Sequence, residues 1–69
     1  MKKTIYEDDY KTFTKLLKKA RLAAGLTQVQ VANEFGATQA YISKVESGQL
    51  RVDVLELRKF AKIYKKEIR

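Results

Sequence analysis

The sequence predicts a small all-α fold, a compact bundle of four to five helices, and three observations support this. The chain has 69 residues, enough for one small domain, and 45% of them are hydrophobic. Proline, which interrupts helices, is absent. Apolar residues recur at spacings of three and four, and no strand-like alternation is long enough to matter.

A short arm is expected over residues 1–8, where Ile5 and Tyr6 either pack on the body or form an extended edge, and a folded domain over residues 9–69. Asp8 or Asp9 is the expected N-cap of a first helix, which Gly25 ends in a left-handed conformation. The inward stripe of this helix is predicted to be Phe13, Leu16, Leu17, Ala20 and Ala24, with Leu22 exposed on the opposite side.

Two short helices are predicted to follow. Thr27 and Gln30 form a capping box for a helix that runs to Phe35 and ends at Gly36. Thr38 caps the next helix, which runs through Ser47 and ends at Gly48. Helices of this length are marginal alone, so their packing must stabilise them. The residues expected to be buried are Val31, Ala32, Phe35, Ile42 and Val45.

A fourth helix is predicted after Asp53, which forms a capping box with Glu56. This helix is expected to continue toward Arg69, so that a fifth helix is short or absent. Its expected inward stripe is Val54, Leu57, Ala61, Tyr64 and Ile68, with Phe60 at the edge. Leu55 and Ile63 are expected to face outwards, where they either seat a partner, as Leu22 also could, or are ordinary surface residues.

The composition argues against several classes of function. Without Cys the chain forms no disulfide, thiol nucleophile or zinc–thiolate site, and without His it lacks the commonest general base. We therefore predict that the protein is not an enzyme and has no metal and no cofactor. No apolar run approaches the roughly 20 residues that a membrane helix needs. The first residues do not resemble a secretory signal, so a cytoplasmic location is expected.

The charge is strongly basic and unevenly distributed. The net charge is +7, from 15 Lys and Arg against 8 Asp and Glu. Residues 1–26 and 51–69 each carry seven basic and three acidic residues, whereas residues 27–50 carry one basic and two acidic residues. Basic flanks suit a polyanionic partner, while a nearly neutral middle suits a more selective contact.

The middle of the chain has the spacing of a DNA-binding helix-turn-helix. Ala32 is small, Gly36 follows four residues later, and Ile42 and Val45 lie six and nine residues beyond that glycine. The stretch AGLTQVQVANEFGATQAYISKVESGQ resembles helix-turn-helix regulators of the Cro/repressor type, also called the xenobiotic-response-element type. The resemblance covers about residues 13–64 and implies a lambda-repressor-like fold that binds double-stranded DNA sequence-specifically as a transcriptional regulator, most simply a repressor.

The resemblance also implies which residues contact DNA. The helix over 38–47 would enter the major groove with its outward residues Thr38, Gln39, Ala40, Ser43 and Lys44. Contacts to phosphates would come from Thr27, Gln28, Tyr41, Ser47, Gln49 and Arg51. Tyr41 has a second interpretation, packing against the body. Arg21 and Glu46 match a pair that forms a structural salt bridge in the family.

The expected partner is double-stranded DNA, bound by a homodimer on a palindromic operator with half-sites about one helical turn apart. The dimer interface is left open, because the fifth helix that often serves it is not evident here. The alternative function is an antitoxin-like protein that binds a partner toxin and autoregulates its operon. No membrane partner and no small-molecule effector are expected.

Overall fold

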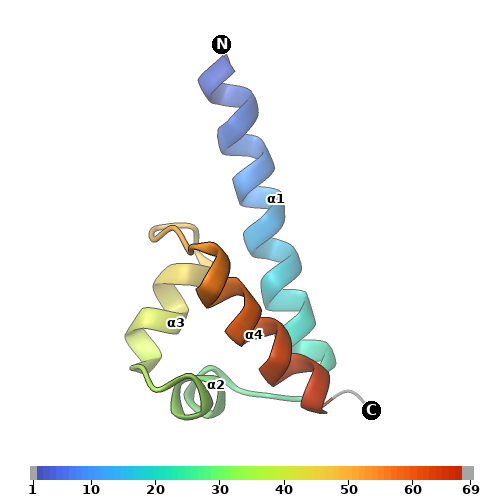
Figure 1. The fold of residues 1–69 in the computed structure, drawn as a ribbon. Coiled ribbons are helices and arrows are strands. Elements are labelled where there is room, and N and C mark those ends of the chain that lie inside the picture. Colours follow the sequence, from blue (N-terminus) through green and yellow to red (C-terminus); the bar gives the residue numbers. More distant parts are fainter. Residues whose placement is uncertain (1, 68–69) are drawn as a thin grey trace.

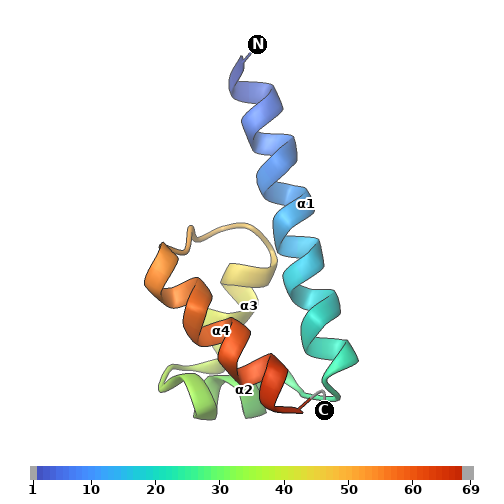
Figure 2. The ribbon, with the colours of Figure 1, turned by 45° about the vertical axis from the view of Figure 1, so that its right-hand side comes forward.

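The chain folds into four helices in the computed structural model, which describes the backbone of residues 2–67 and the side chains of residues 9–65. The helices are α1 (Lys2–Ala23), α2 (Gln28–Phe35), α3 (Gln39–Glu46) and α4 (Val54–Glu67), and the described residues contain no strand. The N-terminal half of α1 extends well beyond the body that the other helices form (Figures 1 and 2). The prediction of an all-α fold is therefore confirmed.

The first helix begins earlier than the sequence analysis expected. Because α1 starts at Lys2, Asp8 and Asp9 lie inside it and neither is its N-cap, so that prediction was wrong. No Gly or Pro precedes Gly25, so nothing in the local sequence prevents the helix from continuing toward the N-terminus. Ile5 and Tyr6 belong to this helix, so the expectation of an extended edge was wrong, and their side chains lie outside the described residues. The division into an arm over 1–8 and a domain over 9–69 stays a prediction.

The predicted caps of the other three helices are confirmed. The Thr27 hydroxyl accepts from the N–H of Gln30 at 3.1 Å, and the Gln30 side chain accepts from the N–H of Thr27 at 2.8 Å. The Thr38 hydroxyl accepts from the third N–H of α3 at 3.1 Å. Asp53 and Glu56 make the same reciprocal pair at 2.8 and 2.9 Å. Each short helix therefore has a start that its own sequence determines.

The turn between α2 and α3 depends on Gly36. Its φ of +85° lies in the left-handed region, where a side chain would be strained. Its N–H donates to the carbonyl of Ala32 at 2.9 Å, which satisfies one of the last carbonyls of α2. The Lys59 ammonium of α4 donates to the Phe35 carbonyl at 3.0 Å and so satisfies a second carbonyl at the end of α2. The end of α2 is thus satisfied partly by its own turn and partly by α4.

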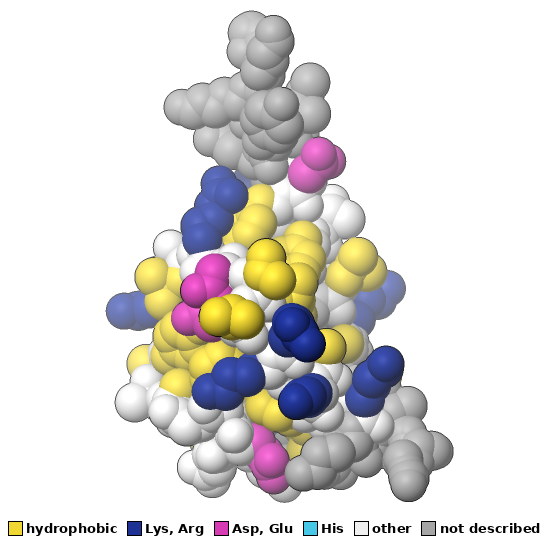
Figure 3. Space-filling model, viewed as in Figure 1, with side chains coloured by type: hydrophobic (Ala, Val, Ile, Leu, Met, Phe, Trp, Pro, Cys, Tyr) yellow, Lys and Arg dark blue, Asp and Glu magenta, His cyan; other side chains and the backbone are white. Residues whose placement is uncertain are grey.

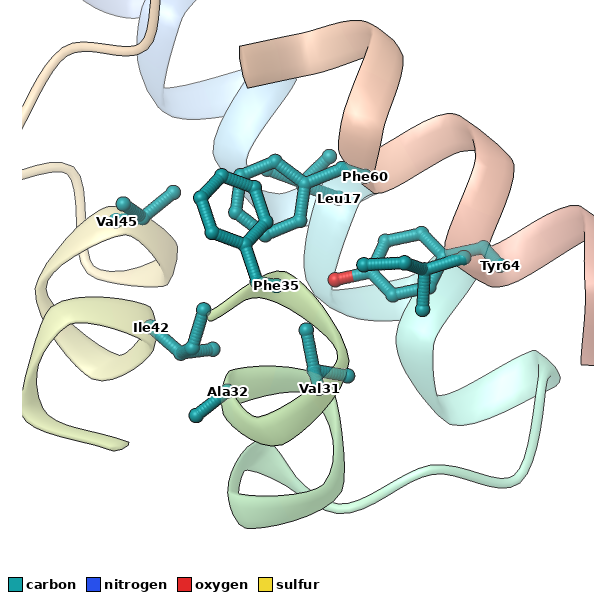
Figure 4. Packing of buried hydrophobic residues seen from close by; sticks show 9 residues of the cluster. Leu17, Val31, Ala32, Phe35, Ile42, Val45, Phe60 and Tyr64 are labelled. Atoms are coloured by element: carbon teal, nitrogen blue, oxygen red, sulfur yellow. The ribbon is translucent and has the colours of Figure 1, made fainter. Parts of the chain in front are cut away.

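The core gathers side chains from all four helices (Figure 4). The five residues predicted to be buried in α2 and α3 are all buried, which confirms the inward faces of both helices. Phe35 and Phe60 join α2 to α4, with ring centroids 4.5 Å apart and planes tilted by 32°. The buried hydrophobic residues are Leu17, Val31, Ala32, Phe35, Ile42, Val45, Phe60, Ile63 and Tyr64.

The buried face of α4 differs from the predicted one, and the expectation that Ile63 faces outwards was wrong. Phe60 and Ile63 are 1% and 7% exposed, whereas Val54 is 71% exposed, and Leu57 and Ala61 are exposed too. Two apolar stripes run along this helix, and periodicity alone cannot choose between them. The contact of Phe60 with Phe35 selects the stripe that faces inwards. Tyr64 is buried and Leu55 exposed, as predicted, and Ile68 lies outside the described residues.

The inward face of α1 was predicted correctly only in part. Leu17 is buried, and Phe13, Ala20 and Ala24 pack against the core, but Leu16 is 58% exposed and that prediction was wrong. Thr14 and Arg21 are buried instead, at 3% and 7% exposure. The ion pair that Arg21 makes with α3 rotates this face of α1 inwards and Leu16 outwards. Leu22 is exposed, as predicted.

No helix in the described part of the chain combines the length and the apolar character that crossing a membrane requires.

Replacing Ala32 by Leu should destabilise the fold. The Ala32 side chain is 3% exposed and points from α2 toward α3 beside Ile42 (Figure 4). Leucine adds three heavy atoms at this site, and a close-packed core responds even to a single added methylene. We expect Ala32→Leu to lower the free energy of unfolding by about 1–3 kcal/mol in denaturant titrations. The exposed Ala61→Leu is the matched control, and an equally small effect of both would contradict tight packing at Ala32.

Candidate nucleic-acid interface

The outward face of α3 consists of small or polar side chains and one lysine. Ile42 and Val45 on its inward face are fully buried, at 0% exposure. All five residues of the predicted base-reading set are exposed: Thr38, Gln39, Ala40, Ser43 and Lys44. The helix thus has one face in the core and the other open to a partner.

A buried ion pair connects α1 to the end of α3. The Arg21 Nε donates to Glu46 Oε2 at 2.6 Å, and Nη2 donates to Oε1 at 3.1 Å. The two side chains are 8% and 4% exposed. Arg21 Nη1 also donates to the carbonyl of Leu26 at 2.8 Å, in the loop before α2. The fork geometry of the guanidinium therefore joins three parts of the chain.

Gln28 extends this ion pair to the start of α3. Its Nε2 donates to Glu46 Oε1 at 3.1 Å, and its Oε1 accepts from Gln39 Nε2 at 2.9 Å. A continuous chain of polar contacts thus runs from Arg21 through Glu46 and Gln28 to Gln39. Gln28 was predicted to contact a phosphate, whereas both ends of its amide are engaged within the protein.

The contact between Gln28 and Gln39 was not predicted, although the sequence contains a signal for it. Each is the first residue of its helix and follows a Thr N-cap, so the pair Thr-Gln occurs at 27–28 and again at 38–39. Two helices that cross near their starts bring equivalent positions close together. The repeated dipeptide could have indicated this contact.

The segment after α3 presents a second set of polar side chains. Ser47, Gln49 and Arg51 are exposed, and the Ser47 hydroxyl donates to the carbonyl of Lys44 at 3.1 Å. The Arg51 guanidinium lies over the ring of Tyr10 in α1, 4.4 Å from its centroid. Tyr10 is a further residue that the sequence analysis did not single out. Its position in the first helix gave no signal for this contact.

Tyr41 packs against the body, which is one of the two alternatives that the sequence left open. Its ring lies 5.5 Å from that of Phe35, with planes tilted by 37°, and its hydroxyl oxygen is buried. Burial raises the pKa of Tyr41, and the carboxylates of Glu56 and Asp53 raise it further. Thr27 is exposed, but its hydroxyl already caps α2.

Tyr64 lies near the ion pair, inside the core. Its hydroxyl is buried without a hydrogen-bond partner among the described residues. Burial raises the pKa of Tyr64 to about 12; the nearby Glu46 carboxylate adds to this effect, and Arg21 opposes it. This tyrosine contributes hydrophobic area at the cost of an unsatisfied hydroxyl.

Acidic side chains are too dispersed to form a metal centre in the described part of the chain, where no group of three or more potential ligands comes together. The absence of a cofactor stays a prediction of the sequence.

Comparison with known proteins gives one finding. The model of a family described as helix-turn-helix matches residues 17–69, which is most of the chain and includes α2, α3 and α4. No curated protein and no solved structure matches significantly.

Removing the Glu46 carboxylate should destabilise the protein strongly. Glu46→Ala leaves Arg21 as a buried charge without its partner, which we expect to lower the free energy of unfolding by about 3–5 kcal/mol. The measurement is chemical denaturation at neutral pH. The paired replacement Arg21→Met with Glu46→Leu is the control, because it removes both charges and should recover most of the loss. An unchanged melting temperature in Glu46→Ala would contradict a structural role for the pair.

Tyr64 should make the protein sensitive to alkaline pH. The folded state holds the phenol proton more tightly, so its stabilising effect is complete below pH 10 and is lost as the pH rises toward 12. The full loss amounts to about 2–3 kcal/mol for a shift of this size, and about half of it is expected at pH 11. Tyr64→Phe should remove this part of the pH dependence and leave the stability at pH 7 unchanged or higher, since an unsatisfied hydroxyl is deleted. Denaturant titrations at pH 8 and pH 11 would test this. An identical change in the free energy of unfolding between the two pH values in both proteins would argue against it.

Proposed function

Because the chain belongs to the helix-turn-helix family of the Cro/repressor type, whose members are DNA-binding transcription regulators, we propose that it reads a specific operator in the major groove with α3 and acts as a repressor. This activity agrees with the cytoplasmic location expected from the sequence. It requires no cofactor. The family is one of DNA-binding regulators and not of enzymes.

The chain of contacts that ends at Gln39 is the observation that carries this proposal. A glutamine amide can pair with N6 and N7 of adenine when both its ends are correctly oriented. The Gln28 amide holds the Gln39 side chain at 2.9 Å, and the buried Glu46 carboxylate holds Gln28. A side chain that is oriented before binding loses less entropy when it binds. Gln39 is exposed and keeps a second N–H and its Oε1 for a base.

The other outward residues of α3 suit further base contacts. Lys44, one residue after Ser43 on the exposed face, can donate to N7 and O6 of guanine. The methyl groups of Thr38 and Ala40 can contact a thymine methyl, and the hydroxyl of Ser43 can bond to several bases. Their short length allows the helix backbone to approach the base edges closely.

Phosphate contacts are proposed on both sides of α3. Thr27 and Gln28 lie at the start of α2, where backbone N–H groups and the positive end of the helix dipole favour an anion. Gln28 would donate through its backbone N–H, because its side-chain amide is engaged within the protein. Ser47, Gln49 and Arg51 follow the end of α3 and are exposed. Contacts of this kind set the register of a helix in the groove without reading sequence.

We propose a homodimer on a palindromic operator, and the start of α4 supports a contact between copies. Val54 and Leu55 are both 71% exposed, and Leu50 and Leu57 are 37% and 36% exposed. Figure 3 shows hydrophobic side chains gathered over the face on which α4 lies, with Lys and Arg side chains around them. Apolar side chains that lie together on a surface gain more from a partner than scattered ones.

The alternative function, an antitoxin-like protein, is favoured by a different surface. A hollow of about 490 Å³ on α1 is lined by Thr12, Lys15, Leu16, Lys18, Lys19 and Leu22. Two exposed leucines framed by lysines suit an acidic amphipathic helix of a partner toxin. Co-purification of the protein encoded beside this one, lost on Leu16→Glu but with DNA binding kept, would favour this function.

In vitro selection of duplex DNA from a random pool tests the proposal directly. We expect one enriched sequence with inverted half-sites about one helical turn apart, and a complex of two chains per site. Enrichment without symmetry and with one chain per site would contradict the dimer. Failure to enrich any sequence over random DNA at moderate salt would contradict specific regulation.

Replacing Gln39 should reduce discrimination between sequences more than affinity for DNA in general. Gln39→Ala removes one amide that pairs with a base, so we expect a loss of about 5- to 150-fold on the selected operator, corresponding to 1–3 kcal/mol, and little change on random duplex. Fluorescence anisotropy on both duplexes gives the ratio. Gln30→Ala is the control, because it also replaces an exposed glutamine but one in the α2 cap. Equal losses on both duplexes would argue against base reading by Gln39.

A further inference from the structure

A hollow of about 260 Å³ lies where the N-terminal half of α1 meets the segment after α3. It is lined by Tyr10, Lys11, Ser47, Gly48 and Arg51. The lining brings together one ammonium, one guanidinium and two hydroxyl groups, and it includes no carboxylate. A concave surface of this composition favours an oxyanion with several acceptor oxygens.

Tyr10 fixes the arginine at the edge of this hollow. The Arg51 guanidinium lies over the Tyr10 ring at 4.4 Å from the centroid, and the Tyr10 hydroxyl donates to the carbonyl of Leu50 at 2.8 Å. The tyrosine therefore holds both the side chain and the backbone of a segment that has no helical structure of its own. Stacking uses the flat face of the guanidinium and leaves the N–H groups at its edge free to donate.

The position of the hollow relates it to α3. Ser47 is the C-cap of α3, whereas Gln39 is its first residue, so the hollow and the candidate base reader lie at opposite ends of the same helix. A helix in the major groove has a sugar–phosphate strand beyond each end. Lys11 brings to one of these ends a positive charge from α1; it belongs to the basic first flank of the sequence but was not singled out there as a DNA contact.

We propose that this hollow binds a backbone phosphate of duplex DNA, with Arg51 and Lys11 as its cationic ligands and Tyr10 as the residue that positions Arg51. The proposal rests on the proposed function and deepens it, because it assigns a DNA contact to α1. Arg51 would donate two N–H groups to the phosphate oxygens, and Lys11 would act as a second point charge. The phosphate contact would fix how far α3 slides along the groove.

The salt dependence of DNA affinity tests this assignment. Each phosphate neutralised contributes about 0.9 to the slope of log K against log salt concentration for duplex DNA. We expect Lys11→Gln to reduce the slope by about 0.9 on the operator and on random duplex alike. Lys19→Gln is the matched control, because it removes the same charge from an exposed site on α1 that lines the other hollow. Equal slopes for the two variants would overturn the role of Lys11.

Variants of Tyr10 test the positioning role separately. Tyr10→Phe keeps the ring under Arg51 and loses only the hydrogen bond to the Leu50 carbonyl. Most of the salt dependence of DNA affinity should therefore remain. Tyr10→Leu removes the stack and should lower affinity for any duplex to nearly the level of Arg51→Gln, and combining the two changes should add little. Additive losses would overturn the positioning role. Circular dichroism melting of each variant shows whether it is folded at the assay temperature.

The outcomes separate this inference from the proposed function. If the protein binds all duplexes equally and Lys11→Gln still reduces the slope, sequence-specific regulation fails while the phosphate site stands. If the operator is selected but Lys11→Gln behaves as Lys19→Gln does, the phosphate site fails alone. A titration with inorganic phosphate, followed through the amide resonances of Ser47 and Gly48, distinguishes a site for a free anion from a site for a DNA phosphate. Shifts with inorganic phosphate that duplex DNA does not reproduce would overturn the assignment to a DNA strand.

Discussion

The buried ion pair between Arg21 and Glu46 is the interaction on which the arrangement of the helices depends. A charge inside a small core is tolerated only when its partner and its remaining hydrogen bonds are present. Here the guanidinium reaches both carboxylate oxygens and the Leu26 carbonyl, so α1, the loop before α2 and the end of α3 are fixed together. The ion pair also explains why α1 turns Arg21 inwards and leaves Leu16 in solvent.

The same carboxylate connects the fold to the proposed recognition surface. Glu46 Oε1 accepts from both Arg21 and Gln28, and Gln28 in turn holds Gln39. The same set of contacts therefore stabilises the fold and orients the Gln39 side chain at the start of α3. A change that shifts α1 relative to α3 would also shift the amide that we propose reads a base. Gln28 alone connects the Glu46 carboxylate to Gln39, so this small domain orients Gln39 with few residues.

The two basic flanks of the sequence have a structural counterpart. Lys11 comes from the first flank and Arg51 from the second, and folding brings them to one hollow at the end of α3. The nearly neutral middle supplies the outward face of α3, where hydrogen bonds rather than net charge would select the sequence. This separation matches the general division between contacts that position a protein on DNA and contacts that specify the site.

Local features could be predicted from the residues alone: the capping pairs, the glycine turn at Gly36 and the inward faces of α2 and α3. Each of them depends on residues within one or two helical turns. It also supplied the helix-turn-helix spacing that the family match supports. The packing of the helices determines which of two apolar stripes α4 buries and how far Leu16 turns outwards. It also brings Gln28 to Gln39 and Tyr10 to Arg51. These contacts join residues from different elements, and their geometry depends on how whole helices dock, which no local pattern encodes.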